Sequence, residues 1–339
     1  MTHRFPIKEI ARQAGVGTAT VDRVLNGRDH VSPQSRLRVA AAIKELTAQE
    51  GQLAARGRRL FFDFVIEAPH RFAREVRTAA EAVLPHIGSA VCRLRFFTQD
   101  TIEDDDVVQM LNRIQKRGSH GVCLKARDRP KIRAAVDRLV AAGIPVVTHV
   151  TDIGGTARLT YVGLDNAGAG RTAAYLMARG LTGQVGTVLA TRSHASFLGE
   201  EERHLAFIDR LAVLQPQLNV VLVDGISGAG HLAAQRLDDA VAGLPDLCAV
   251  YSMGGGNLAI LDALAQHNRR VGMYIGHDLD RDNRAMVSDH RIDFVLHHDL
   301  RVDMSNVFAS FLGHHRIKAP LQQPISTVQI ITPENVPPI

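Results

Sequence analysis

The spacing of hydrophobic residues changes at about residue 60, and this change divides the chain into two parts. In the first part, Ile7, Ile10, Ala11 and Ala14 recur at i, i+3, i+4 and i+7, which predicts one buried stripe on a helix. Beyond residue 60, short hydrophobic runs of strand length alternate with longer amphipathic segments of helix length. The sequence therefore predicts a small all-α head followed by a larger α/β domain.

Two further helices complete the predicted head. The second runs from Thr18 to about Asn26 and turns Val21, Val24 and Leu25 inward. A glycine follows the first helix, where a left-handed residue commonly ends a helix. The third helix begins with a serine cap and a proline in its first turn. Two short helices around a glycine turn fit a helix-turn-helix, although the spacing alone equally fits an ordinary helical pair.

The positive charge of the chain is concentrated in this head. Residues 1–60 contain eleven Lys and Arg against five Asp and Glu, a net charge of +6. Because the whole chain carries +5, the remaining residues carry about −1. Phosphate binding requires such a local excess of positive charge, so the charge favours a DNA-binding helix-turn-helix over a purely structural pair.

The segment AGVGTATVDRVLNGRDHVSPQSRLRV, residues 14–39, resembles the head of the lactose-repressor (LacI/GalR) family. The pattern AGV-x-x-x-TV-x-RVLN, followed by V-S and a helix, carries this resemblance. It implies that Thr18, Ala19 and Arg23 face base edges in the major groove. The chemistry agrees, because arginine pairs with guanine O6 and N7, while Ala19 and the Thr18 methyl group can contact thymine methyls.

The resemblance also concerns the DNA backbone. It assigns three residues to backbone contacts: Thr20, Asn26 and Arg36. Asp22 departs from the small hydroxyl residue that is usual in the family. Because phosphate repels a carboxylate, we expect Asp22 to pair with Arg23 or Arg28, or to accept a hydrogen bond from a cytosine amino group.

Residues 47–60, TAQEGQLAARGRRL, connect the head to the larger domain. In the family, this segment folds into a hinge helix in the minor groove when the dimer is on its operator, and its leucine opens a central base step. Here Gly51 and Gly57 each weaken a helix by roughly 1 kcal/mol relative to alanine. Gly57 also stands about where the inserted apolar side chain is expected, so a flexible basic linker is the alternative. The predicted parts are a helix-turn-helix domain over 1–46, this hinge or linker, and a two-lobed effector-binding and dimerisation domain over 61–339.

From residue 60 onward, strand and helix patterns form two similar sets, separated by a crossing region at residues 161–181. Such β-α units predict parallel sheets with helices on both faces. Two similar α/β lobes imply a ligand cleft between them, at the carboxyl ends of the strands. This part resembles the periplasmic sugar-binding-protein fold that the same repressors use, so the resemblance covers nearly the whole chain.

The resemblance implies effector-binding residues at strand ends of both lobes. They are His70, Phe72, Asp128, Arg203, Asn257, Asp278 and His298. Phe72 can stack on a sugar face, and His70 can donate to a hydroxyl group. One carboxylate from each lobe, Asp128 and Asp278, together with Arg203 suits the recognition of neighbouring hydroxyl groups. Asp128 has an alternative role as the N-cap of the helix that follows it.

The second lobe departs from the commoner family pattern in two places. The segment SMGGGN, residues 252–257, replaces an Asn-Asp pair, and its glycines allow backbone N–H groups to approach a ligand. His298 stands where a glutamine is more usual. Asp152 and Asp165 also lie at strand ends, where we favour a role as loop caps. The effector is therefore predicted to be a sugar, a polyol or a sugar acid.

Metal and enzyme chemistry find little support in the sequence. The sixteen histidines include the adjacent pair His297 and His298, but neighbours on a strand point to opposite faces and cannot simply chelate one ion. The chain has no Cys partner for such a site and no HExxH spacing. Its glycine-rich segments do not match the phosphate-binding or dinucleotide-binding motifs, and no GxSxG elbow holds a nucleophile. We therefore predict no metal, no cofactor and no enzyme activity.

The cysteine residues and the hydropathy of the chain indicate where in the cell the protein is expected. Cys92, Cys123 and Cys248 are far apart and odd in number, which favours reduced, buried thiols over disulfides. No run of eighteen or more apolar residues is present, and the start, MTHRFPIKEI, lacks the apolar core of a signal peptide. We therefore expect no membrane partner and a cytoplasmic location.

These features together predict a transcription regulator that binds double-stranded operator DNA as a homodimer. One small head makes few contacts, whereas two heads read the half-sites of a partly palindromic operator. A small molecule bound between the lobes is expected to change DNA affinity, as in a repressor relieved by an inducer, with corepression left open. Tetramer formation is also open. The alternative is a small-molecule sensor whose head no longer reads DNA specifically.

Overall fold

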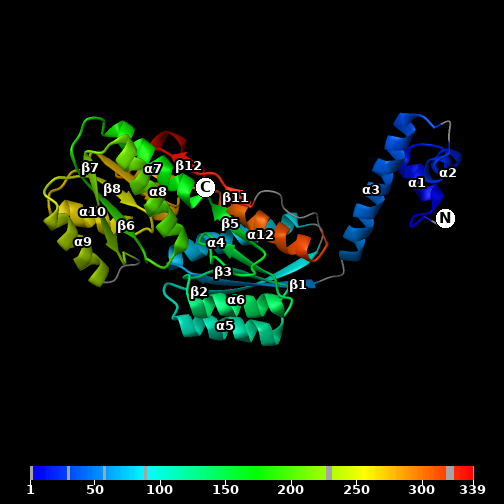
Figure 1. The fold of residues 1–339 in the computed structure, drawn as a ribbon, viewed down its shortest axis with the longest axis horizontal. Coiled ribbons are helices and arrows are strands. Elements are labelled where there is room, and N and C mark those ends of the chain that lie inside the picture. The colour runs from blue at the N-terminus through cyan, green and yellow to red at the C-terminus, as the bar shows by residue number, and fades with distance from the viewer. Residues whose placement is uncertain are drawn as a thin grey trace.

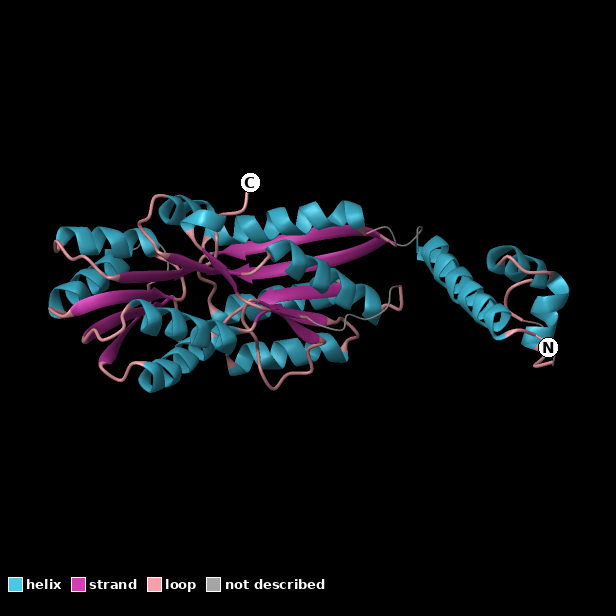
Figure 2. Ribbon diagram, turned by 90° about the horizontal axis from the view of Figure 1, so that it is seen from above, coloured by secondary structure: helices cyan, strands magenta, loops and turns pink. Residues whose placement is uncertain are grey.

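The computed structural model describes residues 3–28, 31–55, 59–87, 90–226, 231–317 and 324–338. A helical head lies at one end of the molecule, and a two-lobed α/β domain forms the rest (Figure 1). Seen from above, the two lobes follow one another along the long axis, with the head beyond them (Figure 2). The predicted fold class, an all-α head followed by a two-lobed α/β domain, is confirmed.

Three helices build the head around one small apolar core. They are α1 (Ile7–Ala14), α2 (Thr18–Leu25) and α3 (Pro33–Ala55). Ile10, Val21 and Val39, one from each helix, are fully buried in this core. Gly15 ends α1 with a φ of 62°, a left-handed conformation that glycine adopts without strain. The helices therefore meet along the predicted apolar stripes, except that Ile7, at the start of α1, is exposed.

Helix α3 is longer than the sequence predicts. It runs without a break to Ala55, whereas a separate linker was expected over residues 47–60. Gly51 lies within this helix, and one glycine costs only about 1 kcal/mol relative to alanine in a helix interior. Residues 56–58, which include Gly57, lie outside the described residues. The boundary of the head and the minor-groove hinge therefore stay predictions.

The first lobe is a six-stranded sheet between two layers of helices. Its elements are β1 (Arg59–Glu67), α4 (His70–Val83), η1 (Leu84–His86), β2 (Val91–Gln99), α5 (Asp104–Arg117), β3 (Gly121–Lys125), α6 (Pro130–Ala141), β4 (Val146–His149), β5 (Thr160–Leu164), α12 (Leu300–His314) and β11 (Ile325–Ser326). The strand order is β11-β5-β4-β3-β1-β2, and neighbouring strands are parallel. Helices α4 and α12 cover one face, and α5 and α6 cover the other (Figure 1). Every residue of β3 is buried, which explains why this strand reads as an almost unbroken apolar run.

The second lobe repeats this arrangement. Its elements are α7 (Asn166–Gly180), β6 (Gly186–Arg192), α8 (Leu198–Leu214), β7 (Leu218–Asp224), α9 (His231–Gly243), β8 (Leu247–Ser252), α10 (Asn257–Gln266), β9 (Met273–His277), α11 (Arg281–Ser288), β10 (Phe294–His297), β12 (Gln329–Ile331) and η2 (Pro333–Asn335). The strand order is β12-β10-β9-β8-β6-β7, in which only β12 is antiparallel to its neighbour. Helices α7 and α8 pack on one face, and α9, α10 and α11 pack on the other.

The chain passes between the lobes at three places. The first passage leads from β5 into α7, within the predicted crossing region at residues 161–181. The second leads from β10 into α12, which packs on the first lobe, and the third leads from β11 to β12. The sequence does not predict the second and third passages. They make the lobes share their C-terminal elements, so the region around these passages can link the two lobes mechanically.

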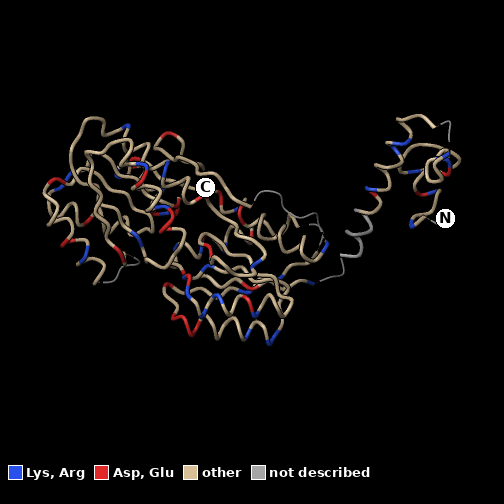
Figure 3. The backbone as a smooth tube through the Cα atoms, viewed as in Figure 1, with Lys and Arg blue, Asp and Glu red and all other residues tan. Residues whose placement is uncertain are grey.

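Charge is distributed differently in the two parts of the chain. Lys and Arg lie along the head helices, whereas both signs of charge are mixed over the two lobes (Figure 3). Among the described residues, no helix has both the length and the apolar character needed to cross a bilayer.

Candidate functional site

A pocket lies between the two lobes, at the carboxyl ends of strands from both sheets. About 830 Å³ of this region is free of protein atoms, a volume that includes space open to solvent. Its walls come from the carboxyl ends of β1, β2, β3 and β4 in the first lobe and of β6, β8 and β9 in the second, with the segments that follow them. The structure thus contains a pocket where the sequence predicts a cleft.

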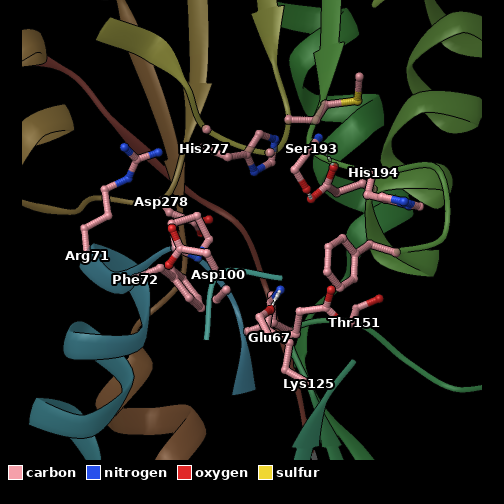
Figure 4. Close-up of a pocket in the computed structure, with 18 of the residues that line it drawn as sticks. Glu67, Arg71, Phe72, Asp100, Lys125, Thr151, Ser193, His194, His277 and Asp278 are labelled. Carbon is pink, nitrogen blue, oxygen red and sulfur yellow. Dashed lines mark hydrogen bonds between the residues drawn. The ribbon is translucent and has the colours of Figure 1, made fainter. Parts of the chain in front are cut away.

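Three of the seven residues predicted to bind an effector line this pocket: Phe72, Arg203 and Asp278. Figure 4 shows Phe72, from α4 of the first lobe, close to Asp278, from the loop after β9 of the second. Arg203 is buried, and its Nε and Nη1 groups donate to Asn166 Oδ1 and to the Met253 carbonyl, each at 2.8 Å. No carboxylate in the described part of the chain pairs with it. Neutral acceptors therefore position this guanidinium, and its charge stays uncompensated at the pocket wall.

Two predicted residues of the first lobe lie outside the pocket. His70 is exposed at the start of α4, and its backbone N–H group donates to Asp100 Oδ1 at 3.0 Å. Both carboxylate oxygens of Asp128 accept hydrogen bonds from Arg133, each at 2.6 Å. Nor does Asp128 cap α6, whose N-terminus has no side-chain cap. An arginine one turn into the following helix thus holds the carboxylate that was expected to face the effector.

Two predicted residues of the second lobe stand one layer behind the pocket. Asn257 is buried, donates to Asn283 Oδ1 at 2.7 Å and accepts from the Tyr274 hydroxyl at 3.0 Å. His298 is also buried, and its Nε2 lies 3.7 Å from Asp278 Oδ1. Because Asn283 and Asp278 line the pocket, Asn257 and His298 hold pocket residues in place.

The two aspartates for which we favour a role as loop caps are also outside the pocket. Asp165 is the N-cap of α7, where its Oδ1 accepts from the Gly168 N–H group at 2.8 Å. Asp152 accepts from the Thr148 hydroxyl at 2.6 Å and pairs with Arg158. Their hydrogen bonds tie down the loops that contain them.

Sequence reasoning missed several charged residues of the pocket. Lys125 Nζ donates to the Glu67 carbonyl at 2.8 Å and lies 4.0 Å from the centroid of the Phe197 ring. Burial lowers the pKa of Lys125 below its usual value. Glu200 accepts from the backbone N–H and the hydroxyl group of Ser193. A lysine that ends the apolar run GVCLK was a visible signal, because charge at a buried strand end points to a site.

A buried charged cluster lies behind Asp278, where β10 leads into α12. The Asp303 carboxylate accepts from His298 Nδ1 and from the Ser326 hydroxyl, each at 2.7 Å, and His149 Nε2 is 3.4 Å away. Burial tends to raise the pKa of Asp303, but its interactions with His149 and His298 outweigh this effect and hold the pKa well below the usual value. Burial tends to lower the pKa of His298, but the Asp303 and Asp278 carboxylates outweigh it, so this pKa is raised. The cluster therefore favours a protonated His298 beside an ionised Asp303.

Within the described part of the chain, no cluster of three or more His, Cys, Asp or Glu side chains is arranged to hold a metal ion. The buried His298 and Asp303 share a hydrogen bond, and His149 Nε2 lies 3.4 Å from the Asp303 carboxylate.

The outward face of α2 is open to solvent. Thr18, Ala19 and Arg23, the residues predicted to face base edges, are exposed on this helix, and Thr20 is half-buried. Their exposure on one short helix leaves them accessible to a DNA groove.

Asp22 is occupied by contacts within the head. Its carboxylate lies 3.4 Å from Arg28 Nη1 and accepts from Asn26 Nδ2 at 2.8 Å. Arg36 Nη2 donates to the Arg28 carbonyl at 3.2 Å. This arrangement matches one of the expected alternatives, in which Asp22 pairs with Arg28. It also gathers Asn26 and Arg36, two of the predicted backbone-contact residues, around one arginine.

Two protein-family models match separate parts of this chain. A model described as "Bacterial regulatory proteins, lacI family" matches residues 6–47, and one described as "Periplasmic binding protein domain" matches residues 64–302. The chain joins a lacI-family head to a periplasmic binding protein domain. Its lacI-family head covers α1, α2 and the first part of α3, and its periplasmic binding protein domain spans both lobes.

Solved structures with the same fold include a sugar-binding protein and a regulator. The chain matches GanP, a glucose-galactose binding protein from Geobacillus stearothermophilus, with a TM-score of 0.70 and 16% identity, over 83% of this chain and 99% of GanP. It matches a putative LacI transcriptional regulator from Bacteroides fragilis with a TM-score of 0.70 and 17% identity, over 82% of this chain and 99% of that one. At these identities, the likeness shows the fold alone.

A curated relative shares part of the chain. The chain is 26% identical over 180 residues to the HTH-type transcriptional regulator AglR of Rhizobium meliloti (strain 1021). The match covers 50% of this chain and 48% of AglR, so the chain spans about half the length of the curated relative that it matches. The two family models and this relative together confirm the predicted resemblance, a lacI-family head followed by a periplasmic-binding-protein-like domain.

Proposed function

We propose that this lacI-family regulator binds a partly palindromic operator as a homodimer, and that a small polyhydroxylated molecule, a sugar or a polyol, controls this binding. The observation that carries the proposal is the pocket between the lobes, where Arg203 offers free donors and Asp278 offers free acceptors. Phe72 adds an aromatic face on which a sugar ring can pack. The proposal includes no catalytic step and no cofactor.

The charge balance of the pocket supports a neutral ligand. Its wall holds three cations and five carboxylates, so negative charge is in excess and an anionic ligand is disfavoured; the cations are Arg71, Lys125 and Arg203, and the carboxylates are Glu67, Asp100, Glu200, Asp278 and Asp280. A hydroxyl group accepts from a cation and donates to a carboxylate at the same time. Several hydroxyl groups on one small ring satisfy such a mixed set better than a single charged group. GanP, which has the same fold, is a glucose-galactose binding protein, and this supports the same ligand class. A sugar acid is the second candidate, because Arg203 has no carboxylate partner.

In this proposal, the effector acts by changing how the two lobes are positioned relative to each other. A ligand that contacts both walls favours the arrangement in which the walls approach it together. The head joins the first lobe, because α3 leads toward β1, which begins at Arg59. A change in the first lobes of both protomers therefore changes how the two heads are held on their half-sites. We expect the effector to release DNA, as an inducer does.

A thermal-shift screen tests the ligand class. The full chain is screened against neutral sugars, polyols, sugar acids and sugar phosphates. A ligand at about 100 times its dissociation constant adds roughly 2.7 kcal/mol to the free energy of unfolding, which raises the melting temperature measurably. We expect hits among neutral sugars or polyols. Hits confined to sugar acids would select the second candidate, and an absence of hits across the panel would contradict a carbohydrate-like effector.

Arg23→Ala is expected to lose discrimination at one base pair of each half-site. The cost is about 1–3 kcal/mol, because a bidentate contact with guanine disappears. Duplexes selected from a random library by the wild-type protein supply the specific DNA, and fluorescence anisotropy on single base-pair variants measures the loss. Arg36→Ala is the matched control, since loss of a phosphate contact weakens binding to every sequence alike. A uniform loss for Arg23→Ala as well would make Arg23 a backbone contact.

A further inference from the structure

His277, the last residue of β9, lines the pocket with a ring whose two nitrogens have different surroundings (Figure 4). Nε2 lies 2.9 Å from the hydroxyl oxygen of Tyr251, a fully buried residue of β8 that does not line the pocket. Nδ1 is buried and has no hydrogen-bond partner among the described residues. An unpartnered polar atom in a pocket wall indicates a group that a ligand satisfies.

The position of the ring proton follows from the hydrogen-bond partners. Burial, with the positive charges of Arg203 and His298, lowers the pKa of His277 well below its usual value, so the ring is neutral and carries one proton. If that proton were on Nε2, it would point at the Tyr251 oxygen. The Tyr251 hydroxyl would then be a buried donor without an acceptor, because His277 is its only partner in the described part of the chain. With the Tyr251 hydroxyl donating to Nε2, the ring proton lies on Nδ1 instead.

The backbone at this point turns two consecutive side chains toward the same pocket. Neighbours on a strand normally point to opposite faces, yet His277 and Asp278 both line it. Asp278 has a φ of 64°, in the left-handed region that non-glycine residues rarely enter. The side-chain amide of Asn283 donates to the carbonyls of both residues, at 2.8 and 2.6 Å, and so holds this turn. Such a turn sets a donor from His277 beside an acceptor from Asp278.

We propose that His277 is a specificity-determining residue of the effector site, and that Tyr251 positions it by fixing the proton on Nδ1. His277 then donates to an oxygen of the effector, while Asp278 accepts from a neighbouring hydroxyl group. The inference rests on the proposed function and deepens it. The effector must present a lone pair at His277, so a hydroxyl, ring or carbonyl oxygen fits there, whereas an ammonium group does not. Tyr251 acts only through the ring, because it does not reach the pocket.

Histidine-selective ¹⁵N NMR of the full chain, without any effector, tests the tautomer directly. The resonances of His277 are assigned by their loss in His277→Phe. We expect Nε2 to be unprotonated and Nδ1 to be protonated, with no change across the pH range in which exposed histidines titrate. Tyr251→Phe removes the donor to Nε2 and should shift the proton population toward Nε2. A wild-type ring protonated on Nε2, or on both nitrogens at neutral pH, would overturn the proposal.

Ligand binding provides the second measurement, with the best-binding sugar of the thermal-shift panel as the probe. Tyr251→Phe should weaken its binding about tenfold, the scale of one lost hydrogen bond. Thr187→Val is the matched control, because it deletes a buried hydroxyl of the same lobe that donates to Asp246, and neither residue lines the pocket. Equal weakening by both variants would reduce Tyr251 to a structural role and overturn the proposal. If no sugar of the panel binds the wild-type protein, the proposed ligand class fails, and the NMR measurement alone decides the tautomer.

Discussion

Asp303→Asn is expected to lower the free energy of unfolding by about 3–5 kcal/mol, because it leaves the His298 cation buried without its counter-charge. Asp303 is fully buried and accepts hydrogen bonds from His298 and Ser326, each at 2.7 Å. An asparagine presents one oxygen and one N–H₂ group, so it can satisfy only part of this set. Urea denaturation of the full chain, followed by circular dichroism, measures the loss.

The size of this effect reflects the place of Asp303 in the fold. Its carboxylate joins α12 to the end of β10 through His298 and to β11 through Ser326. It also lies near His149, at the end of β4. The two later passages of the chain between the lobes are thus tied together by one carboxylate.

Asp299→Asn provides a matched control on the same helix. Asp299 is exposed at the N-cap of α12, where its Oδ1 accepts from the N–H groups of Arg301 and Val302. Asparagine caps a helix about as well as aspartate, so a change of no more than about 0.5 kcal/mol is expected. Comparable losses in Asp299→Asn and Asp303→Asn would show that the helix end, and not the buried ion pair, carries the stability.

The same cluster predicts how stability depends on pH. The pKa of His298 is raised in the folded state, so its contribution is complete below the unfolded pKa of about 6.5 and is lost as pH rises through the folded value. The pKa of Asp303 is lowered, so its contribution is complete above the unfolded pKa of about 3.9 and is lost as pH falls toward the folded value. The difference between the wild type and Asp303→Asn should therefore be largest between about pH 4 and pH 6.5. A difference that stays constant at higher pH would contradict a charged His298.

Arg203→Ala is expected to weaken effector binding about 100-fold, or roughly 2.7 kcal/mol, and to leave DNA binding intact. The substitution removes a buried guanidinium whose remaining donors are free at the pocket wall. Titration calorimetry with the best-binding sugar measures the first effect, and fluorescence anisotropy with the selected duplex measures the second. The sugar should then fail to release DNA at concentrations that release it from the wild-type protein.

Arg210→Ala controls for charge and helix position, because Arg210 is exposed on the same helix and does not line the pocket between the lobes. Arg203→Ala also leaves Asn166 and the Met253 carbonyl without a donor, so the melting temperature of each variant is recorded alongside. An intact sugar response in folded Arg203→Ala would show that the pocket is assigned wrongly. Loss of DNA binding as well as sugar binding would point to a general defect of folding.

The sequence predicts the fold well where one periodicity dominates. The run GVCLK at residues 121–125 is buried throughout, and the apolar stripe of α1 buries Ile10, Ala11 and Ala14 but leaves Ile7 exposed. The return of α12 to the first lobe is not predictable in this way, because it depends on partners far along the chain. The continuation of α3 to Ala55 was missed for another reason. Gly51 has low helix propensity, but extending a helix that is already formed is easier than starting a new one.

The site was predictable where a residue type and a strand end coincide. Phe72 and Asp278 were found in this way, whereas Arg203, inside α8, was found from the family resemblance. Asp128 also follows a strand, but it does not line the pocket. Arg133, five residues further along the chain, donates hydrogen bonds to both of its carboxylate oxygens.

His277 lines the pocket but was not predicted from the sequence. It precedes the expected Asp278 in the printed sequence, but nothing local reveals that Tyr251, 26 residues earlier, holds one of its nitrogens. The left-handed turn at Asp278, which brings both side chains to the pocket, is likewise visible only in the folded chain.

The most direct test of ligand-controlled DNA binding is the affinity for the selected duplex, measured with and without the best-binding sugar at fixed salt concentration. A coupling of about 1–3 kcal/mol, or a change of roughly 5–150-fold, is typical of allosteric regulators. Reciprocity requires that saturating duplex change the sugar affinity by the same factor. We predict weaker DNA binding in the presence of sugar and the matching reciprocal change. Equal DNA affinity with and without bound sugar would contradict the account, because the pocket would then have no control over the head.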